Sequence, residues 1–114
     1  MKRWTLPELI ENNMFGIMEK LPCEPEELEP VKTIEYEYTA DNPKAWVRSE
    51  HHEQLFRYPC VLAVLRVFKG AELTLSPQVP SVAKKTKTHL LVVKTSYKTY
   101  GVLLGIKKEE EARS

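Results

Sequence analysis

Hydrophobic and polar residues alternate strictly between Lys32 and Ala40. Ile34, Tyr36 and Tyr38 are separated by single threonine or glutamate residues, so every second side chain is apolar. A period of two residues is typical of a β-strand with one buried face and one solvated face. This segment therefore predicts a half-buried strand whose wet face is acidic.

The second half of the chain contains further apolar segments that predict β-structure. The near-continuous run from Cys60 to Phe68 predicts a buried strand, and a tight turn at Lys69-Gly70 leads into a second strand, Ala71 to Leu75. The segments His89 to Thr95 and Thr99 to Ile106 flank a short polar stretch. They predict an antiparallel hairpin.

The N-terminal region has helical spacing instead. Thr5 stands three residues before Glu8, which is the spacing of a capping box, and Pro22 ends the predicted helix near Leu21. Apolar residues recur at helical intervals, at Ile10, Met14, Ile17, Met18 and Leu21. We expect this stripe to be buried against the sheet, and docking of a partner helix is the alternative.

The segment from Lys44 to Phe56 has an irregular apolar stripe and predicts a short helix or an irregular loop. The whole pattern predicts an α+β fold, in which one N-terminal amphipathic helix packs on a mostly antiparallel sheet of about five strands. The sequence does not decide between an open sheet and a small closed barrel. A length of 114 residues fits a single domain spanning 1–114.

Charge divides the chain into two regions. Residues 1–56 contain six basic and twelve acidic residues, whereas residues 57–108 contain ten basic residues and one acid, Glu72; a charged tail, 109–114, follows. The net charge of +1 conceals this asymmetry. A basic region of this kind indicates either a surface for an anionic partner or neutralisation by the acidic half, and both explanations stay open.

A group of lysines in the basic region is the strongest candidate for a binding surface. Lysines attract carboxylates and phosphates, and tyrosine rings offer a surface for stacking. The predicted partner-binding residues are Lys84, Lys85, Lys87, Lys94, Tyr97 and Lys98, with Tyr100 beside them. An acidic protein surface is the expected partner, and nucleic acid is the alternative, because phosphates would satisfy the same lysines.

The sequence contains no recognisable catalytic motif. It lacks a glycine-rich phosphate loop and a serine nucleophile elbow, and Asp41 is its single aspartate. The adjacent His51 and His52 fall on different sides of a helix or a strand, so a metal site there would need a distant ligand such as His89 or Cys60. We therefore expect no enzyme activity, metal or cofactor, and a metal- or histidine-dependent enzyme is the third hypothesis.

Two cysteines, Cys23 and Cys60, are too few for a disulfide framework, and we expect both to be reduced. The longest apolar run, Cys60 to Leu65, is too short to cross a membrane. Glu8 and Glu11 interrupt the apolar core that an export signal needs. These features predict a cytoplasmic protein without a membrane partner.

The last predicted hairpin reads His89-Leu90-Leu91-Val92-Val93-Lys94-Thr95 and then Tyr100-Gly101-Val102-Leu103-Leu104-Gly105-Ile106. This pattern is similar to the strand–turn–strand found late in CheW-type chemotaxis adaptor domains, whose second strand also follows a glycine. The asparagine-arginine-glycine stretch usual in the middle of that family is missing here. The resemblance implies a non-catalytic adaptor, and the expected function is a small binding module that acts through protein–protein contacts.

Overall fold

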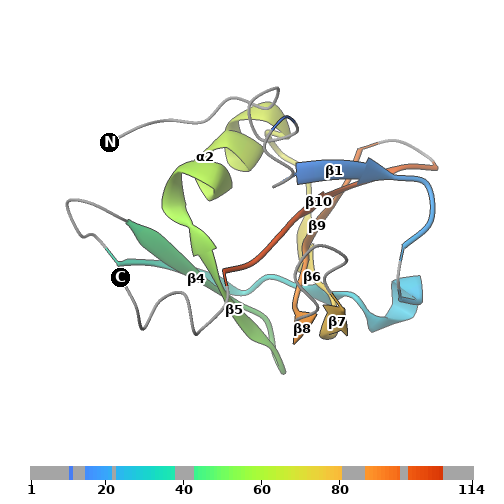
Figure 1. Cartoon of the computed structure of the whole chain (residues 1–114), viewed down its shortest axis with the longest axis horizontal. Coiled ribbons are helices and arrows are strands. Elements are labelled where there is room, and N and C mark those ends of the chain that lie inside the picture. Colours follow the sequence, from blue (N-terminus) through green and yellow to red (C-terminus); the bar gives the residue numbers. More distant parts are fainter. Residues whose placement is uncertain are drawn as a thin grey trace.

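The computed structural model describes residue 11 and residues 15–21, 23–37, 43–80, 87–95 and 98–106. This part of the chain forms two antiparallel sheets beside one helix, together with a short two-stranded ribbon (Figure 1). The strands are β1 (Phe15–Met18), β2 (Glu29–Pro30), β3 (Thr33–Glu37), β4 (Lys44–Arg48), β5 (Glu53–Arg57), β6 (Leu73–Leu75), β7 (Val79–Pro80), β8 (Lys87–Thr88), β9 (Leu91–Lys94) and β10 (Tyr100–Leu103). The helices are the short 3-10 helix η1 (Pro25–Glu27) and α2 (Tyr58–Val67).

The larger sheet has the strand order β1-β10-β9-β6-β2, and all its neighbouring strands are antiparallel. The register places four apolar residues in one row across the sheet, namely Phe15, Leu103, Leu91 and Leu75. All four are buried in the same core as the α2 residues. We call this side of the sheet the inner face.

The outer face of the same sheet carries the alternate residues, because successive side chains of a strand point to opposite sides. One row crosses all five strands and consists of Gly16, Val102, Val92, Thr74 and Pro30. Val92 and Val102 are buried in a second apolar cluster, which we call the outer-face cluster. The larger sheet is therefore apolar at the centre of both faces.

The smaller sheet has the order β3-β4-β5 and joins the larger sheet at both sides. Only Val31 and Lys32 separate β2, which pairs with β6, from β3, which pairs with β4. At the other side, Ile106 N, just after β10, donates a hydrogen bond to Leu55 O of β5 (2.8 Å). These links hold the smaller sheet against the larger one.

Residues 58–67 form α2, so the strand predicted from Cys60 to Phe68 is wrong. Pro59 lies in the first turn, where its lack of an N–H leaves no helical hydrogen bond unmade. Val61 and Val64 are three residues apart and buried against the sheets. Periodicity cannot distinguish a buried strand from a buried helix within a continuous apolar run, which explains the error.

The predicted N-terminal helix is wrong over residues 15–21, because residues 15–18 form β1 and residues 19–21 are not helical, whereas Glu11, the one described residue before them, is helical. Pairing with β10 overrides the helical spacing. Ile17 is 52% exposed rather than buried, whereas Met18 packs against the outer-face cluster. Ile10 and Met14 lie outside the described residues. The fold-class prediction therefore has its helix in the wrong place: α2, in the middle of the chain, packs on the sheets.

The structure contradicts one further predicted element and confirms two others. The segment from Lys44 to Phe56, predicted as a short helix or loop, forms the hairpin β4–β5, in which Ala45 and Val47 are buried at a period of two. The strand predicted within 32–40 is confirmed as β3, and the last hairpin is confirmed as β9–β10.

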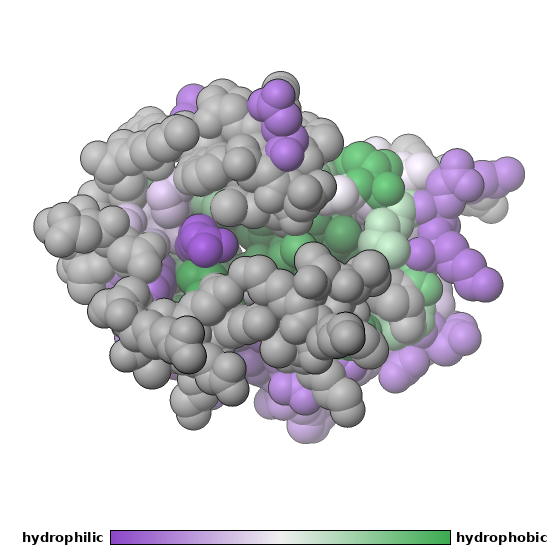
Figure 2. Space-filling model, viewed as in Figure 1, coloured by the Kyte–Doolittle hydropathy of each residue, from purple (hydrophilic) through white to green (hydrophobic). Residues whose placement is uncertain are grey.

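In Figure 2, apolar residues gather in a band across the viewed face and reach the surface near β1.

Candidate functional site

The outer face of the larger sheet becomes polar at Lys94 and Tyr100. These residues lie directly opposite each other on β9 and β10, two positions beyond Val92 and Val102. Opposed residues of neighbouring strands project to the same side of the sheet. Lys94 is exposed, and Tyr100 packs partly buried against the outer-face cluster. An ammonium group and an aromatic ring therefore lie together at the surface.

A pocket of about 270 Å³ lies beside this lysine–tyrosine pair. Some of its residues belong to the outer face of the sheet, and others belong to the η1 segment. The residues that line it are Pro25, Leu28, Pro30, Glu72, Thr74, Val92, Lys94 and Tyr100. We call it the outer-face pocket. Its lining is mostly apolar, with one cation and one anion.

The η1 segment that borders this pocket is held in place by its own sequence. Glu24 N donates to Glu27 Oε1 (3.1 Å), and Leu28 N donates to Pro25 O (3.2 Å). Pro25 has a fixed φ that suits the start of a helical turn. Leu28 then packs against the outer-face cluster. The segment from Pro25 to Pro30 thus presents apolar side chains beside the lysine–tyrosine pair.

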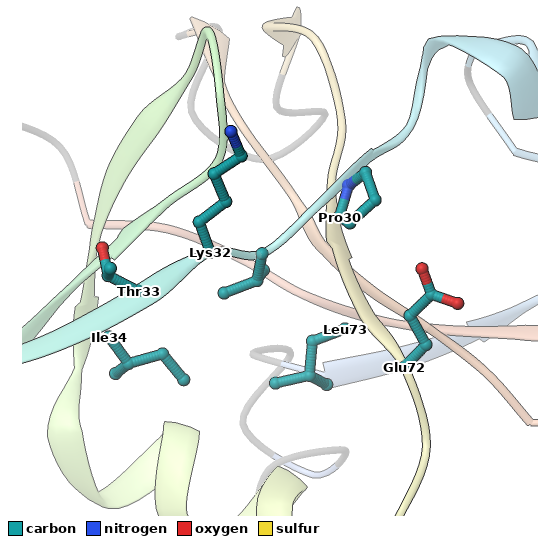
Figure 3. A pocket seen from close by; sticks show the side chains of 7 residues that line it. Pro30, Lys32, Thr33, Ile34, Glu72 and Leu73 are labelled. Atoms are coloured by element: carbon teal, nitrogen blue, oxygen red, sulfur yellow. The ribbon is translucent and has the colours of Figure 1, made fainter.

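A second pocket, of about 370 Å³, lies where the β2–β3 segment leaves the larger sheet for the smaller one. We call it the bend pocket, and the residues that line it are Pro30, Val31, Lys32, Thr33, Ile34, Glu72 and Leu73. Figure 3 shows Lys32 and Glu72 on two sides of this pocket, and the Lys32 amine points away from Ile34 and Leu73. Pro30 and Glu72 line both pockets, so the two pockets adjoin along the β2–β6 edge.

The predicted partner-binding residues are only partly described. Lys94 and Lys98 are exposed, on β9 and in the turn that follows it. Lys87 belongs to β8, but its side chain lies outside the described part of the chain, as do the whole residues Lys84, Lys85 and Tyr97. The structure therefore brings Lys94 together with Tyr100 and does not test the rest of the set.

Sequence analysis missed the apolar half of the outer-face pocket. Pro25, Leu28 and Pro30 come from the acidic connector, and Thr74 comes from β6. No local signal links these residues to Lys94. Only the pairing of Pro30 with Thr74 brings this glutamate-rich segment to the sheet.

Ion pairs in the described residues lie within the acidic half of the chain. Arg48 pairs with Glu35 (2.8 Å) and with Glu53 (3.0 Å). Across the described ranges, neither Lys94 nor Lys98 has an ion pair with a residue of the first 56. Lys94 and Lys98 are therefore not neutralised by the described part of the acidic half.

A separate polar cluster surrounds Glu29, at the end of the inner row opposite Leu75. Its carboxylate accepts hydrogen bonds from Ser49 Oγ (2.7 Å), from His51 N (2.9 Å) and from His51 Nδ1 (2.8 Å). His52 Nε2 lies 3.7 Å from the same carboxylate. The hydroxyl of Ser49 and the amide of His51 are the main causes that lower the pKa of Glu29 from 4.5 to about 2. Glu29 therefore holds the β4–β5 turn to the larger sheet as a carboxylate.

The two adjacent histidines reach one carboxylate because they lie in a turn rather than in a helix or a strand. The His52 ring also lies 4.7 Å from the His89 ring, centroid to centroid. Gln54 completes the junction: Oε1 accepts from His89 N (3.0 Å), and Nε2 donates to Ile106 O (3.0 Å). The expectation that adjacent histidines diverge was wrong for this turn.

This junction has the geometry of a structural network. His89 Nδ1 donates to Ser76 O (2.8 Å), and the Ser49 hydroxyl donates to the Glu29 carboxylate rather than to a histidine ring nitrogen. A nucleophile needs a base as its hydrogen-bond partner, and the partner of Ser49 is Glu29, whose lowered pKa of about 2 makes it a weak base. Among the residues that the structure describes, no group of three histidine, cysteine or acidic side chains is placed to hold a metal ion.

Neither Cys23 nor Cys60 is in a disulfide. Burial raises the pKa of the Cys60 thiol to about 11, and burial also raises the pKa of Cys23. Both groups are therefore thiols rather than reactive thiolates at neutral pH. No helix in the described ranges is long and apolar enough to span a bilayer.

Comparison of the chain with protein-family models, with curated proteins and with solved structures finds no match. The similarity to CheW-type adaptor domains remains a similarity of the β9–β10 hairpin.

Proposed function

We propose that this chain is a small, non-catalytic, cytoplasmic binding module that contacts an acidic protein surface. The outer-face pocket and the lysines beside it form the proposed contact. One observation carries the proposal: Lys94 and Tyr100 lie as an opposed pair at a mostly apolar pocket. Apolar pockets with a few polar groups at the edge are the usual anchors of protein–protein contacts.

The chemistry of the pocket favours a peptide segment. Pro25, Leu28 and Pro30 accept an aliphatic or proline side chain, and Lys94 attracts a neighbouring carboxylate. Lys98 extends the positive charge along the same hairpin. The proposed partner is therefore an acidic segment with an apolar anchor. Nucleic acid is the competing partner, because it also bears anionic groups and stackable rings.

The test is a titration of isotope-labelled protein followed by backbone amide chemical shifts. The probes are the synthetic peptide Glu-Pro-Gln-Leu-Glu and a short single-stranded oligonucleotide. Peptide binding at the pocket should shift the amides of Thr74, Val92, Lys94 and Tyr100. Lys94→Glu should abolish these shifts, because like charges repel at the contact. Lys69→Glu, an exposed basic residue that does not line the pocket, is the matched control.

The outcomes separate the two partners. Peptide shifts confined to the pocket and lost in Lys94→Glu support the proposal. Oligonucleotide binding that falls steeply with salt, with no peptide shifts, would replace it with the nucleic-acid hypothesis, since phosphate contacts release counterions. Peptide shifts that centre on His51 and His52, or that persist in Lys94→Glu, would also contradict the proposal.

A further inference from the structure

Glu72 is the only acid between residues 57 and 108, and the structure places it at the centre of the candidate surface. It is exposed and lines both the outer-face pocket and the bend pocket. Within the described ranges, no ion pair or hydrogen bond involving its side chain is present. The carboxylate is therefore available to a partner.

Two lysines flank this carboxylate. β6 pairs with β9 at Leu73 and Val93, so the next position outward places Glu72 opposite Lys94. On its other side, Lys32 lines the bend pocket together with Glu72 (Figure 3). The surface around the β2–β6 edge thus presents a cation, an anion and a cation in sequence, with Pro30 shared by both pockets.

We propose that Glu72 is a specificity-determining residue, which selects a protein segment with a basic residue between acidic ones and rejects a uniform polyanion. This inference rests on the proposed function and names the charge pattern of its partner. An acidic side chain on each side pairs with Lys32 and Lys94, and a lysine or arginine between them pairs with Glu72.

The physical basis is a difference between two kinds of anionic ligand. A nucleic acid carries a negative charge at every phosphate, so a strand that contacts both lysines also passes the Glu72 carboxylate and is repelled there. A peptide can change the sign of its charge from one side chain to the next. Repulsion between like charges lowers the affinity for the wrong partner. A single exposed acid such as Glu72 can therefore discriminate between a peptide and a nucleic acid.

The experiment compares Glu72→Gln and Glu72→Lys with wild type. The peptide probes are Glu-Pro-Lys-Leu-Glu and Glu-Pro-Gln-Leu-Glu, which differ in the central residue alone, and the third probe is a short single-stranded oligonucleotide. Glu50→Lys is the matched control, because it makes the same charge change at an exposed site in the β4–β5 turn. Circular dichroism verifies that each variant is folded.

Wild type should prefer the lysine-centred peptide by up to about fivefold, the range that exposed charge pairs give. Glu72→Gln should remove this preference, and Glu72→Lys should reverse it. Glu72→Lys should also raise oligonucleotide affinity more than Glu50→Lys does, because only the first removes the repulsion at the surface. Both results together support the inference.

Two failures are distinguishable. If Lys94→Glu abolishes peptide binding but Glu72→Lys leaves the peptide preference unchanged, the inference about Glu72 is wrong and the proposed function stands. If neither peptide binds wild type, the proposed function is wrong. In that case the oligonucleotide arm still decides the inference: an equal gain in Glu72→Lys and Glu50→Lys shows a net-charge effect and overturns the role of Glu72.

Discussion

The inner face of the larger sheet carries four apolar residues in one row that share a core with α2, whereas its outer face changes from valine at the centre to lysine and tyrosine toward one end. Both faces are built by the same strands in the same register. On the inner face, Leu91, Leu103 and Leu75 lie side by side and are buried. On the outer face, buried Val92 is followed on its strand by exposed Lys94.

This difference separates stability from binding. The four apolar side chains of the inner row are buried within the chain, so their packing contributes to folding stability. The outer-face pocket retains apolar lining that the described residues do not fill, together with charges that face solvent. Substitutions in the inner row should therefore change the free energy of unfolding, whereas substitutions at the outer-face pocket should change partner binding.

The largest effect is expected from Leu91→Ala on the inner face. Leu91 is 1% exposed and lies at the centre of the row. Its truncation should lower the free energy of unfolding by about 2–5 kcal/mol, because it removes buried methyl groups and leaves a cavity. Urea denaturation measures the change. Lys94→Ala on the same strand is the control, and a loss no larger than in that variant would contradict the contrast between the faces.

A smaller loss is expected from Gly101→Ala. An added Cβ would lie 2.4 Å from Phe15 Cζ and 3.1 Å from Val93 Cγ1, and Phe15 is held by stacking on Phe68 at 5.7 Å. Forcing this ring aside should lower the free energy of unfolding by about 1–3 kcal/mol.

Gly16→Ala is the matched control for Gly101→Ala. Gly16 belongs to the outer row, and the nearest atom to an added Cβ there is Val102 Cγ2, at 4.0 Å. This variant should keep wild-type stability or gain a little, because alanine reduces the freedom of the unfolded chain. Thermal denaturation of both variants makes the comparison, and equal losses would show that space on the inner face is not the cause.

The polar end of the inner row should show a pH-dependent effect. Glu29 is 22% exposed and its pKa is lowered from 4.5 to about 2, chiefly by the Ser49 hydroxyl. A group whose pKa is lower in the folded state adds stability above its unfolded pKa and loses it as the pH falls toward its folded pKa. Wild type should therefore be more stable than Glu29→Gln at neutral pH, and this advantage should shrink between about pH 4.5 and pH 2.

Denaturation of wild type and Glu29→Gln across that pH range measures the effect. Glu26→Gln, an exposed acid in η1, is the control and should show no such change. A constant difference between wild type and Glu29→Gln from pH 7 to pH 2 would show that the carboxylate does not act through its charge.

The smallest effect is expected at Ile17, which helical spacing predicted to be in the core. Because its side chain is 52% exposed on β1, Ile17→Ala should lower the free energy of unfolding by about 1 kcal/mol or less. A buried helix position would lose about 2–5 kcal/mol. The loss in the free energy of unfolding, measured by chemical denaturation, therefore distinguishes an exposed strand position from a buried helix position at Ile17.

The sequence predicted those elements whose signals are local. The β9–β10 hairpin has two apolar segments around a polar turn, and β3 alternates strictly, so both were found. β1 has no such signal, because it becomes a strand by pairing with β10 far along the chain. In α2, Pro59 and the spacing of Val61 and Val64 carried a helical signal, but the apolar run hid it.

Only part of the candidate site could likewise be predicted from the sequence. Lys94 and Lys98 were predicted from charge alone, since a basic region is visible without a fold. Pro30 and Thr74 were missed because register, not composition, makes them neighbours. The His52–His89 contact was missed for the same reason: one ring lies in the β4–β5 turn and the other precedes β9.

Because β1 pairs with β10, the pairing also affects the order in which parts of the fold can form. Four elements follow one another directly along the chain, namely β3, β4, β5 and α2. Phe15, by contrast, pairs with Leu103, which lies far along the chain. Contacts between sequence neighbours form early, and distant contacts require the closure of a long loop. During synthesis, the three-stranded sheet and α2 can therefore assemble before Tyr100–Leu103 leaves the ribosome. Until then Phe15, one of the buried core residues of the finished sheet, lacks the strand with which it pairs.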